Sequence, residues 1–172
     1  MKVDSIIFIG MAGVGKSTIG TVVAKALGFS FTDLDDYIVE KEQKTIQEII
    51  DSEGGEGFLQ VEKRRMNEIS LTRRVVAPGG SIIYHRDLMQ SLKKNATLVY
   101  LDDTFKNIQN NLDGMAEFRG IVGLKDKSLR QVYNERKYLY SKYADITVKC
   151  EGKSPGELSR EILIQFLEME NG

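Results

Sequence analysis

The chain of 172 residues has the length of about one domain, and its 41% hydrophobic and 28% charged residues are typical of globular rather than disordered proteins. A formal net charge of −1 gives no bulk attraction to nucleic acid or to an acidic membrane surface. One cysteine and one histidine exclude a disulfide framework and a His/Cys metal site, and the longest apolar run near the start is too short for a signal peptide or a membrane span. We therefore expect a single domain over residues 1–172 in a cytoplasmic protein, and the small size and balanced charge favour a monomer.

Short apolar segments alternate with helical patterns along the chain. Residues 5–9 form a β-branched and aromatic run, which is typical of a strand buried on both faces of a parallel sheet. Apolar positions then recur at helical spacing over residues 16–27 and end at Gly28, where a C-cap belongs. The later predicted elements are strands over 29–33, 75–77, 97–101 and 146–148, helical sequence over 36–71 with breaks near Thr45 and across 53–57, helical sequence between 77 and 97, and a closing helix over 157–168 capped by Ser154. This alternation predicts a βαβ architecture with a parallel sheet.

Residues 10–17 fit the phosphate-binding pattern G-x-x-x-x-G-K-[ST], between a predicted strand and a predicted helix. In such a loop the backbone N–H groups point toward phosphate oxygens, and glycines stand where side chains would collide. A lysine supplies a cation for the β and γ phosphates, a serine supplies a hydroxyl for Mg²⁺, and the following helix directs its positive end at the anion. The pattern predicts a site for ATP and Mg²⁺ made of Gly13, Val14, Gly15, Lys16, Ser17 and Thr18.

Acidic and glycine-rich residues follow two other predicted strands. Asp33 and Asp35 end the second strand at the sheet edge where ligands gather in open α/β folds, so one carboxylate can reach the Mg²⁺ shell while the other meets a substrate hydroxyl. The alternative is a solvated acidic turn. After Pro78, Gly79 and Gly80 close another strand at the same edge, where they either admit a phosphate or substrate close to the backbone or form only a tight turn.

Residues 113–127 contain three glycines and show weak periodicity, which predicts a mobile lid. Arg119 lies in this segment and Arg136 in the helix that follows. A lid arginine can stabilise charge on a transferred phosphoryl group, although a solvated surface cation is the simpler alternative for each arginine. We interpret His85 as a surface or packing histidine and Cys150 as partly buried and inert.

Over nearly its full length the chain resembles the shikimate kinase family, small P-loop kinases within the nucleoside monophosphate kinase group. Beyond the phosphate loop, the resemblance is carried by residues 31–35, 53–58, 78–80, 134–136, 139–140 and 143–145. It implies an α/β P-loop fold of three layers, with a five-stranded parallel sheet flanked by helices and a mobile lid. It also implies transfer of the ATP γ-phosphate to a ring hydroxyl of shikimate, a step of aromatic amino acid biosynthesis.

The resemblance implies which residues hold the nucleotide and the metal. Lys16 and Ser17 match the residues that hold phosphate and Mg²⁺, and Asp33 matches the residue that supports the metal through water. Lys153 and Pro155 lie where the C-terminal loop of the family borders the adenine.

The resemblance also implies how the acceptor is bound. Asp35 matches the residue that binds the accepting hydroxyl and takes its proton, and Arg119 matches the catalytic lid arginine. Arg136 matches the arginine that pairs with the substrate carboxylate, and Gly79 and Gly80 line the substrate floor.

Three features depart from the family pattern. One is the turn at residues 78–81, Pro-Gly-Gly-Ser, where the three-glycine turn of the family is shortened or altered. Leu59 stands where the family carries an arginine that also grips the substrate carboxylate, and Leu112 stands where an arginine stacks on adenine. Loss of one charge-assisted contact to a carboxylate costs on the order of 1.5 to 3 kcal/mol of binding free energy. Arg64 or Arg65, about a helical turn and a half further on, is a candidate to supply the missing contact. Three hypotheses remain: a kinase for shikimate, a related kinase for homoserine or another small hydroxyl metabolite, and a nucleotide-binding regulatory module without transfer chemistry.

Overall fold

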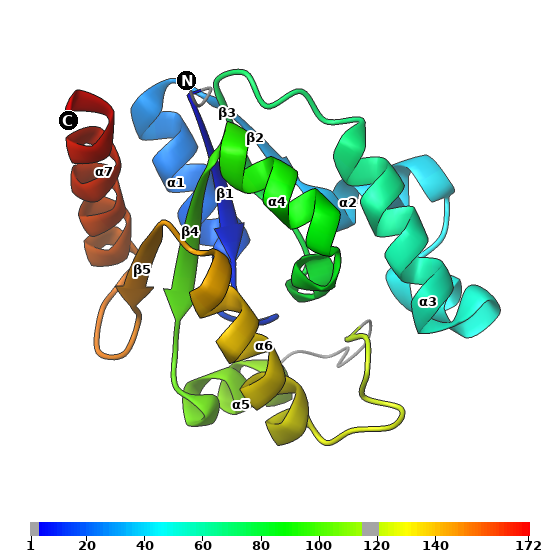
Figure 1. Cartoon of the computed structure of the whole chain (residues 1–172). Helices are drawn as coiled ribbons and strands as arrows, with labels where there is room; N and C mark the ends of the chain where they lie inside the picture. The colour runs from blue at the N-terminus through cyan, green and yellow to red at the C-terminus, as the bar shows by residue number, and fades with distance from the viewer. Residues whose placement is uncertain (1–3, 115–120) are drawn as a thin grey trace.

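The computed structural model describes residues 4–114 and 121–172, in which strands and helices alternate (Figure 1). The strands are β1 (Ser5–Ile9), β2 (Ser30–Asp33), β3 (Arg74–Ala77), β4 (Thr97–Asp102) and β5 (Ile146–Lys149). The helices are α1 (Lys16–Leu27), α2 (Leu34–Glu42), α3 (Ile46–Asn67), the short 3-10 helix η1 (Gly80–Tyr84), α4 (Arg86–Asn95), α5 (Phe105–Asp113), α6 (Leu129–Tyr143) and α7 (Pro155–Asn171).

The five strands form one parallel sheet in the order β2-β3-β1-β4-β5. The central strand β1 pairs on both sides, so that Ile7 lies in register with Val76 of β3 and with Leu98 of β4. All five residues of β1 are buried, which is why its sequence is almost continuously apolar. The predicted five-stranded parallel sheet is confirmed.

Helices cover both faces of the sheet and make three layers (Figure 1). Helices α1 and α7 pack against each other on one face, while α4 and α6 pack on the other. Helices α2 and α3 lie beside the β2 edge. The carboxyl ends of the strands all point to the lower side of Figure 1, so the segments that leave them meet at one edge.

Most predicted helix signals are confirmed. Ser154 caps α7 by accepting a hydrogen bond from the backbone N–H of Glu157 at 3.2 Å, and Thr45 caps α3 in the same way. The predicted break across residues 53–57 is confirmed within α3, because Gly54 has non-helical angles (φ 75°, ψ 174°) and kinks the helix there. Glycine adopts such angles at little cost, which is why the helix is interrupted within this glycine cluster.

In the ranges that the structure describes, no helix is both long enough and apolar enough to cross a bilayer.

Candidate active site

A cavity of about 320 Å³ opens at the carboxyl ends of β1, β2 and β3. It brings together most of the residues that the sequence predicted for the site: Gly13, Gly15, Lys16, Ser17, Thr18, Asp33, Asp35, Gly79, Gly80 and Arg136. Its wall also contains Ala12, Phe58, Ala77, Pro78, Ser81, Leu112 and Ile121. Two segments far apart in sequence, the phosphate loop and α6, therefore face the same space.

The phosphate loop runs from β1 into the N-terminus of α1. Gly13 and Gly15 have φ values of 81° and 100°, a left-handed conformation that side chains rarely adopt. The Lys16 ammonium donates hydrogen bonds to the carbonyl oxygens of Gly10 (2.7 Å) and Met11 (2.9 Å). Burial lowers the pKa of Lys16 to about 8, with the Asp35 charge acting in the opposite direction. The ammonium therefore stays largely protonated at neutral pH, beside the positive end of a helix.

Ser17 and Asp33 form the part of the site that suits a metal ion. The Ser17 hydroxyl donates to Oδ2 of Asp33, while Oδ1 of Asp33 accepts the backbone N–H of Asp36 at 3.0 Å and caps α2. Hydroxyl and carboxylate oxygens are donors that Mg²⁺ prefers, and Mg²⁺ commonly keeps several waters. Across the described ranges no group of three or more His, Cys, Asp or Glu side chains makes a closed metal cage. This donor set fits a hydrated Mg²⁺.

Asp35 does not end the second strand as expected, because β2 stops at Asp33 and Asp35 lies in the first turn of α2. Its side chain still faces the cavity, where the buried Oδ1 atom has no hydrogen-bond partner among the described residues. Burial, together with the charges of Glu62 and Asp33, raises the pKa of Asp35 to about 7. A buried acceptor without a donor suits a substrate hydroxyl.

Arg136 is a buried residue of α6, with 1% of its surface exposed, so the solvated-cation alternative is wrong. Its Nη2 donates to the carbonyl oxygen of Val122 (2.7 Å) and its Nε to the Tyr84 hydroxyl (3.3 Å). Within residues 4–114 and 121–172, no carboxylate lies within ion-pair distance of the guanidinium. A buried cation without an anionic partner indicates a site for an anion.

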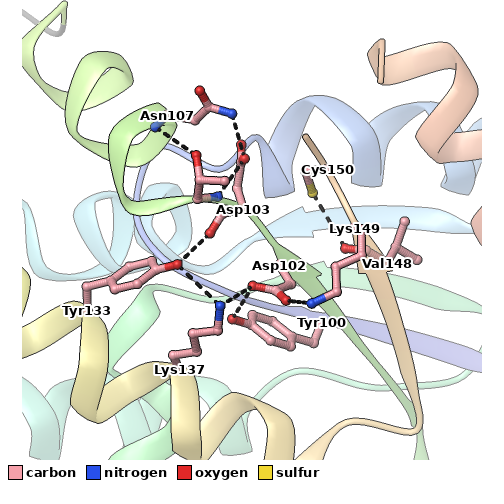
Figure 2. A network of polar contacts seen from close by, with 10 residues as sticks. Tyr100, Asp102, Asp103, Asn107, Tyr133, Lys137, Val148, Lys149 and Cys150 are labelled. Atoms are coloured by element: carbon pink, nitrogen blue, oxygen red, sulfur yellow. Dashed lines mark hydrogen bonds and ion pairs between the residues drawn. The ribbon is translucent and has the colours of Figure 1, made fainter. Parts of the chain in front are cut away.

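A polar network holds α6 against the ends of β4 and β5 (Figure 2). The Tyr133 hydroxyl donates to the carbonyl oxygen of Asp103 (2.7 Å), and the Lys137 ammonium lies 3.3 Å from Oδ1 of Asp102. Lys149 of β5 pairs with Oδ2 of Asp102. Burial opposes ionisation of Asp102, but the two lysines hold its pKa below the usual range. The network fixes the helix that carries Arg136.

Ser81 lines the cavity, Glu62 and His85 lie beside it, and none of the three was predicted for the site. Glu62 is fully buried, and its carboxylate accepts hydrogen bonds from Ser81 and from the ring of His85. The expectation of a surface or packing role for His85 is incomplete, because only 8% of its side chain is exposed and its ring makes a polar contact. A signal existed in the sequence, because Glu62 lies one helical turn after Phe58 on the apolar face of α3.

The position of Leu59 is explained by a second cavity. This cavity of about 780 Å³ lies between α3 and residues 121–126, and Leu59 lines it rather than the first cavity. Arg64 and Arg65 do not replace the missing arginine. Both pair with Glu42, at 2.7 and 2.8 Å, on the side of α3 that faces α2.

Three other residues can be placed relative to the predicted nucleotide site. Leu112 lines the first cavity, and its Cδ2 would lie 3.2 Å from a Cβ added at Gly13. Lys153 pairs with Glu161 (2.6 Å), and Pro155 is the first residue of α7; neither lines the cavity. Arg119 and the rest of residues 115–120 of the predicted lid lie outside the described residues, so the role of Arg119 and the closure of the lid stay predictions.

Substitution of Gly80 tests how closely the site is packed. A Cβ at Gly80 would lie 2.7 Å from Nη1 of Arg136 and 2.9 Å from the Tyr140 hydroxyl. Arg136 is held by the hydrogen bond from its Nη2 to Val122, and the Tyr140 hydroxyl donates to the carbonyl oxygen of Gly80. We expect Gly80→Ala to displace Arg136 and to raise the KM for the acceptor about tenfold or more, with a smaller change in the KM for ATP. Steady-state kinetics measure both values. Gly156→Ala is the control, because a Cβ there meets only open space and the Ser154 hydroxyl at 3.9 Å.

The fold and the site together define a P-loop kinase of small molecules. A phosphate loop follows the central strand of a parallel sheet, and its lysine shares a cavity with a buried carboxylate and a buried guanidinium. The family model described as shikimate kinase matches residues 12–167. The chain belongs to the shikimate kinase family and is an ATP-using small-molecule kinase.

Individual relatives agree with this assignment. The chain is 33% identical over 160 residues to a shikimate kinase of Persephonella marina, covering 92% of this chain and 96% of that protein. It is 32% identical over 161 residues to human threonine synthase-like 1, covering 92% of this chain but only 22% of that protein. The solved structure of shikimate kinase from Acinetobacter baumannii in complex with shikimate superposes with a TM-score of 0.85 at 28% identity, covering 97% of this chain and 94% of that one.

Proposed function

We propose that this kinase transfers the γ-phosphate of ATP to a hydroxyl of shikimate and forms shikimate 3-phosphate. The observation that carries the proposal is a buried arginine, Arg136, in the same cavity as Asp35 and Lys16. A compact acid that bears both a carboxylate and a hydroxyl satisfies the guanidinium and the unpaired Oδ1 of Asp35 together. The likeness to a shikimate kinase solved with shikimate supports the choice of acid.

The residues of the phosphate loop have distinct roles in this proposal. Lys16 neutralises charge on the β and γ phosphates, and Ser17 and Asp33 hold Mg²⁺, which when bound neutralises further phosphate charge. Asp35 accepts a hydrogen bond from the attacking hydroxyl and orients it for in-line transfer. Arg119, carried by a lid over residues 113–127, stabilises the phosphoryl group when the lid closes.

The other predicted residues line the acceptor pocket and the adenine site. Gly79 and Gly80 line the floor beneath the acceptor. Lys153 and Pro155, in the segment after β5, border the adenine. The protein acts as a cytoplasmic monomer with small-molecule partners and without nucleic acid; size-exclusion chromatography with light scattering tests the monomer.

A second candidate acceptor is homoserine, which offers one carboxylate and a primary hydroxyl. The observation that favours it is the absence of a second carboxylate-binding arginine in the described site, since Leu59 faces the other cavity and Arg64 and Arg65 pair with acidic side chains.

The experiment that distinguishes these acceptors is ADP release by the purified protein with Mg-ATP, measured with shikimate, with homoserine and without acceptor. We expect turnover with shikimate well above the rate without acceptor. Turnover with homoserine alone would contradict shikimate as the substrate and support the second candidate. Silence with both would contradict the proposed kinase reaction and favour a nucleotide-binding regulatory module.

A further inference from the structure

A buried carboxylate that the proposed reaction does not use lies directly behind the acceptor pocket. Glu62 of α3 has no exposed surface. Its hydrogen bonds come from the Ser81 hydroxyl, at 3.0 Å to Oε1 and 2.8 Å to Oε2, and from Nε2 of His85, at 3.2 Å to Oε1. No lysine or arginine of the described ranges lies within ion-pair distance of it. A buried carboxylate is costly unless donors surround it.

The Glu62 carboxylate needs a second hydrogen-bond donor besides Ser81, and His85 is placed to supply it. Ser81 has one hydroxyl proton to share between the two oxygens of the carboxylate, so it fully satisfies neither. The ring nitrogen Nε2 of His85 lies 3.2 Å from Oε1, and the tautomer that carries its proton on Nε2 donates to this oxygen. The imidazole thus supplies the second donor. His85 is the single histidine of the sequence, which makes its ring unusually easy to observe.

The carboxylate of Glu62 lies against the floor of the acceptor pocket. A Cβ added at Gly79 would lie 3.2 Å from Oε2 of Glu62 and 3.0 Å from Oδ1 of Asp35, so both carboxylates converge on the backbone of Gly79. Ser81, the hydrogen-bond partner of Glu62, lines the same pocket. The charge of Glu62 is also among the causes that raise the pKa of Asp35. A shift of Glu62 is therefore transmitted to the residues that meet the acceptor.

The backbone of His85 connects η1, which follows the floor of the acceptor pocket, to α4. Its N–H donates to the carbonyl oxygen of Ile82 in η1 (3.2 Å), and its own carbonyl oxygen accepts the N–H of Met89 in α4 (2.8 Å). Helix η1 starts at Gly80, which lies next to Arg136, and ends at Tyr84. The Tyr84 hydroxyl accepts a hydrogen bond from Nε of Arg136. The contact between the His85 side chain and Glu62 of α3 therefore holds the η1 turn in place. Gly80 and Tyr84, at the two ends of this turn, are the residues that lie next to the Arg136 guanidinium.

We propose that His85 is a positioning residue of the acceptor site, acting through Glu62 to hold Ser81 and the η1 turn in the geometry that receives the acceptor. This inference rests on the proposed function and deepens it. His85 does not line the cavity. Its loss should therefore affect the acceptor and leave nucleotide binding nearly unchanged.

The test compares three variants of the full chain in steady-state kinetics with ATP and whichever acceptor the wild type phosphorylates. His85→Leu removes the donor, His85→Gln keeps an N–H donor at a similar reach, and Arg86→Leu is a neighbouring exposed control. We expect His85→Leu to raise the KM for the acceptor about tenfold with less than about a twofold change in the KM for ATP. His85→Gln should recover most of the loss, and Arg86→Leu should match the wild type.

Several results would overturn the role of His85. One is an unchanged acceptor KM in His85→Leu; another is a His85→Gln variant that is no better than His85→Leu. If His85→Leu fails to fold, NMR of the single imidazole in the wild type decides instead. Its ring signals should move on addition of the acceptor and stay in place with a non-hydrolysable ATP analogue, and signals indifferent to the acceptor would overturn the proposal. A wild type that phosphorylates neither shikimate nor homoserine overturns the proposed function and this role together.

Discussion

Replacement of Lys16 by methionine is expected to lower kcat by about 10³-fold or more while the protein stays folded. Lys16 is the cation of the phosphate loop, buried at the N-terminus of α1 and protonated at neutral pH despite a pKa lowered to about 8. Methionine keeps the apolar stem of the side chain and removes only the charge and the hydrogen bonds to Gly10 and Met11. The measurement is ADP release with Mg-ATP and the acceptor, beside circular dichroism of the same sample.

The control for this substitution is Lys25→Met, which removes an exposed lysine from the last turn of the same helix. It should retain the wild-type rate. A Lys16→Met variant that is folded and turns over within about threefold of the wild type would show that the loop does not bind the transferred phosphate.

Replacement of Asp35 by asparagine is expected to lower kcat/KM for the acceptor by about 10²-fold or more and to change its pH dependence. In the wild type, burial raises the pKa of Asp35 to about 7, so the fraction of ionised carboxylate increases as the pH rises through this value. Because the ionised form accepts the hydrogen bond of the attacking hydroxyl, the wild-type kcat/KM should rise toward pH 7 and level off above it. The asparagine variant should lack this acidic limb.

The same pKa shift predicts a change in stability. A carboxyl group whose pKa is raised on folding binds its proton more tightly in the folded state, so the free energy of unfolding falls as the pH rises from about 4 toward 7. Asp35→Asn removes this loss, and the variant should resist urea better than the wild type above pH 7. Asp4→Asn is the control, since Asp4 is an exposed acidic residue before β1 and far from the cavity lining. For the kinetic prediction, a kcat/KM that still rises toward pH 7 in Asp35→Asn would show that a group other than Asp35 causes the pH dependence.

Local patterns predicted much of the fold and part of the site. The phosphate loop was predictable because its glycines, lysine and serine act within a few residues of one another. The cap at Ser154 and the apolar strand β1 are equally local. Asp35 was predicted at the end of the second strand but lies in the first turn of α2. The reason is that the Asp33 side chain caps α2 and starts the helix directly at the end of the strand.

Contacts between distant segments were beyond such patterns. Glu62 lies in α3 and His85 lies between η1 and α4, and the two meet only because α3 packs against η1. The same packing decides that Arg64 and Arg65 turn toward Glu42, while Leu59 faces a separate cavity. Helical spacing shows which residues share a face, but not what that face will meet.

The sequence by itself thus determined the class of fold and the phosphate-binding chemistry, because these depend on local conformation and on the spacing of a few residues. Only the tertiary structure decided the environment of each charge. It buried Arg136 beside Gly80, left Oδ1 of Asp35 without a donor in the described part of the chain, and set a second carboxylate behind the pocket floor. Burial and the nearness of other charges change what a side chain can bind, and both arise from packing between elements far apart in the sequence.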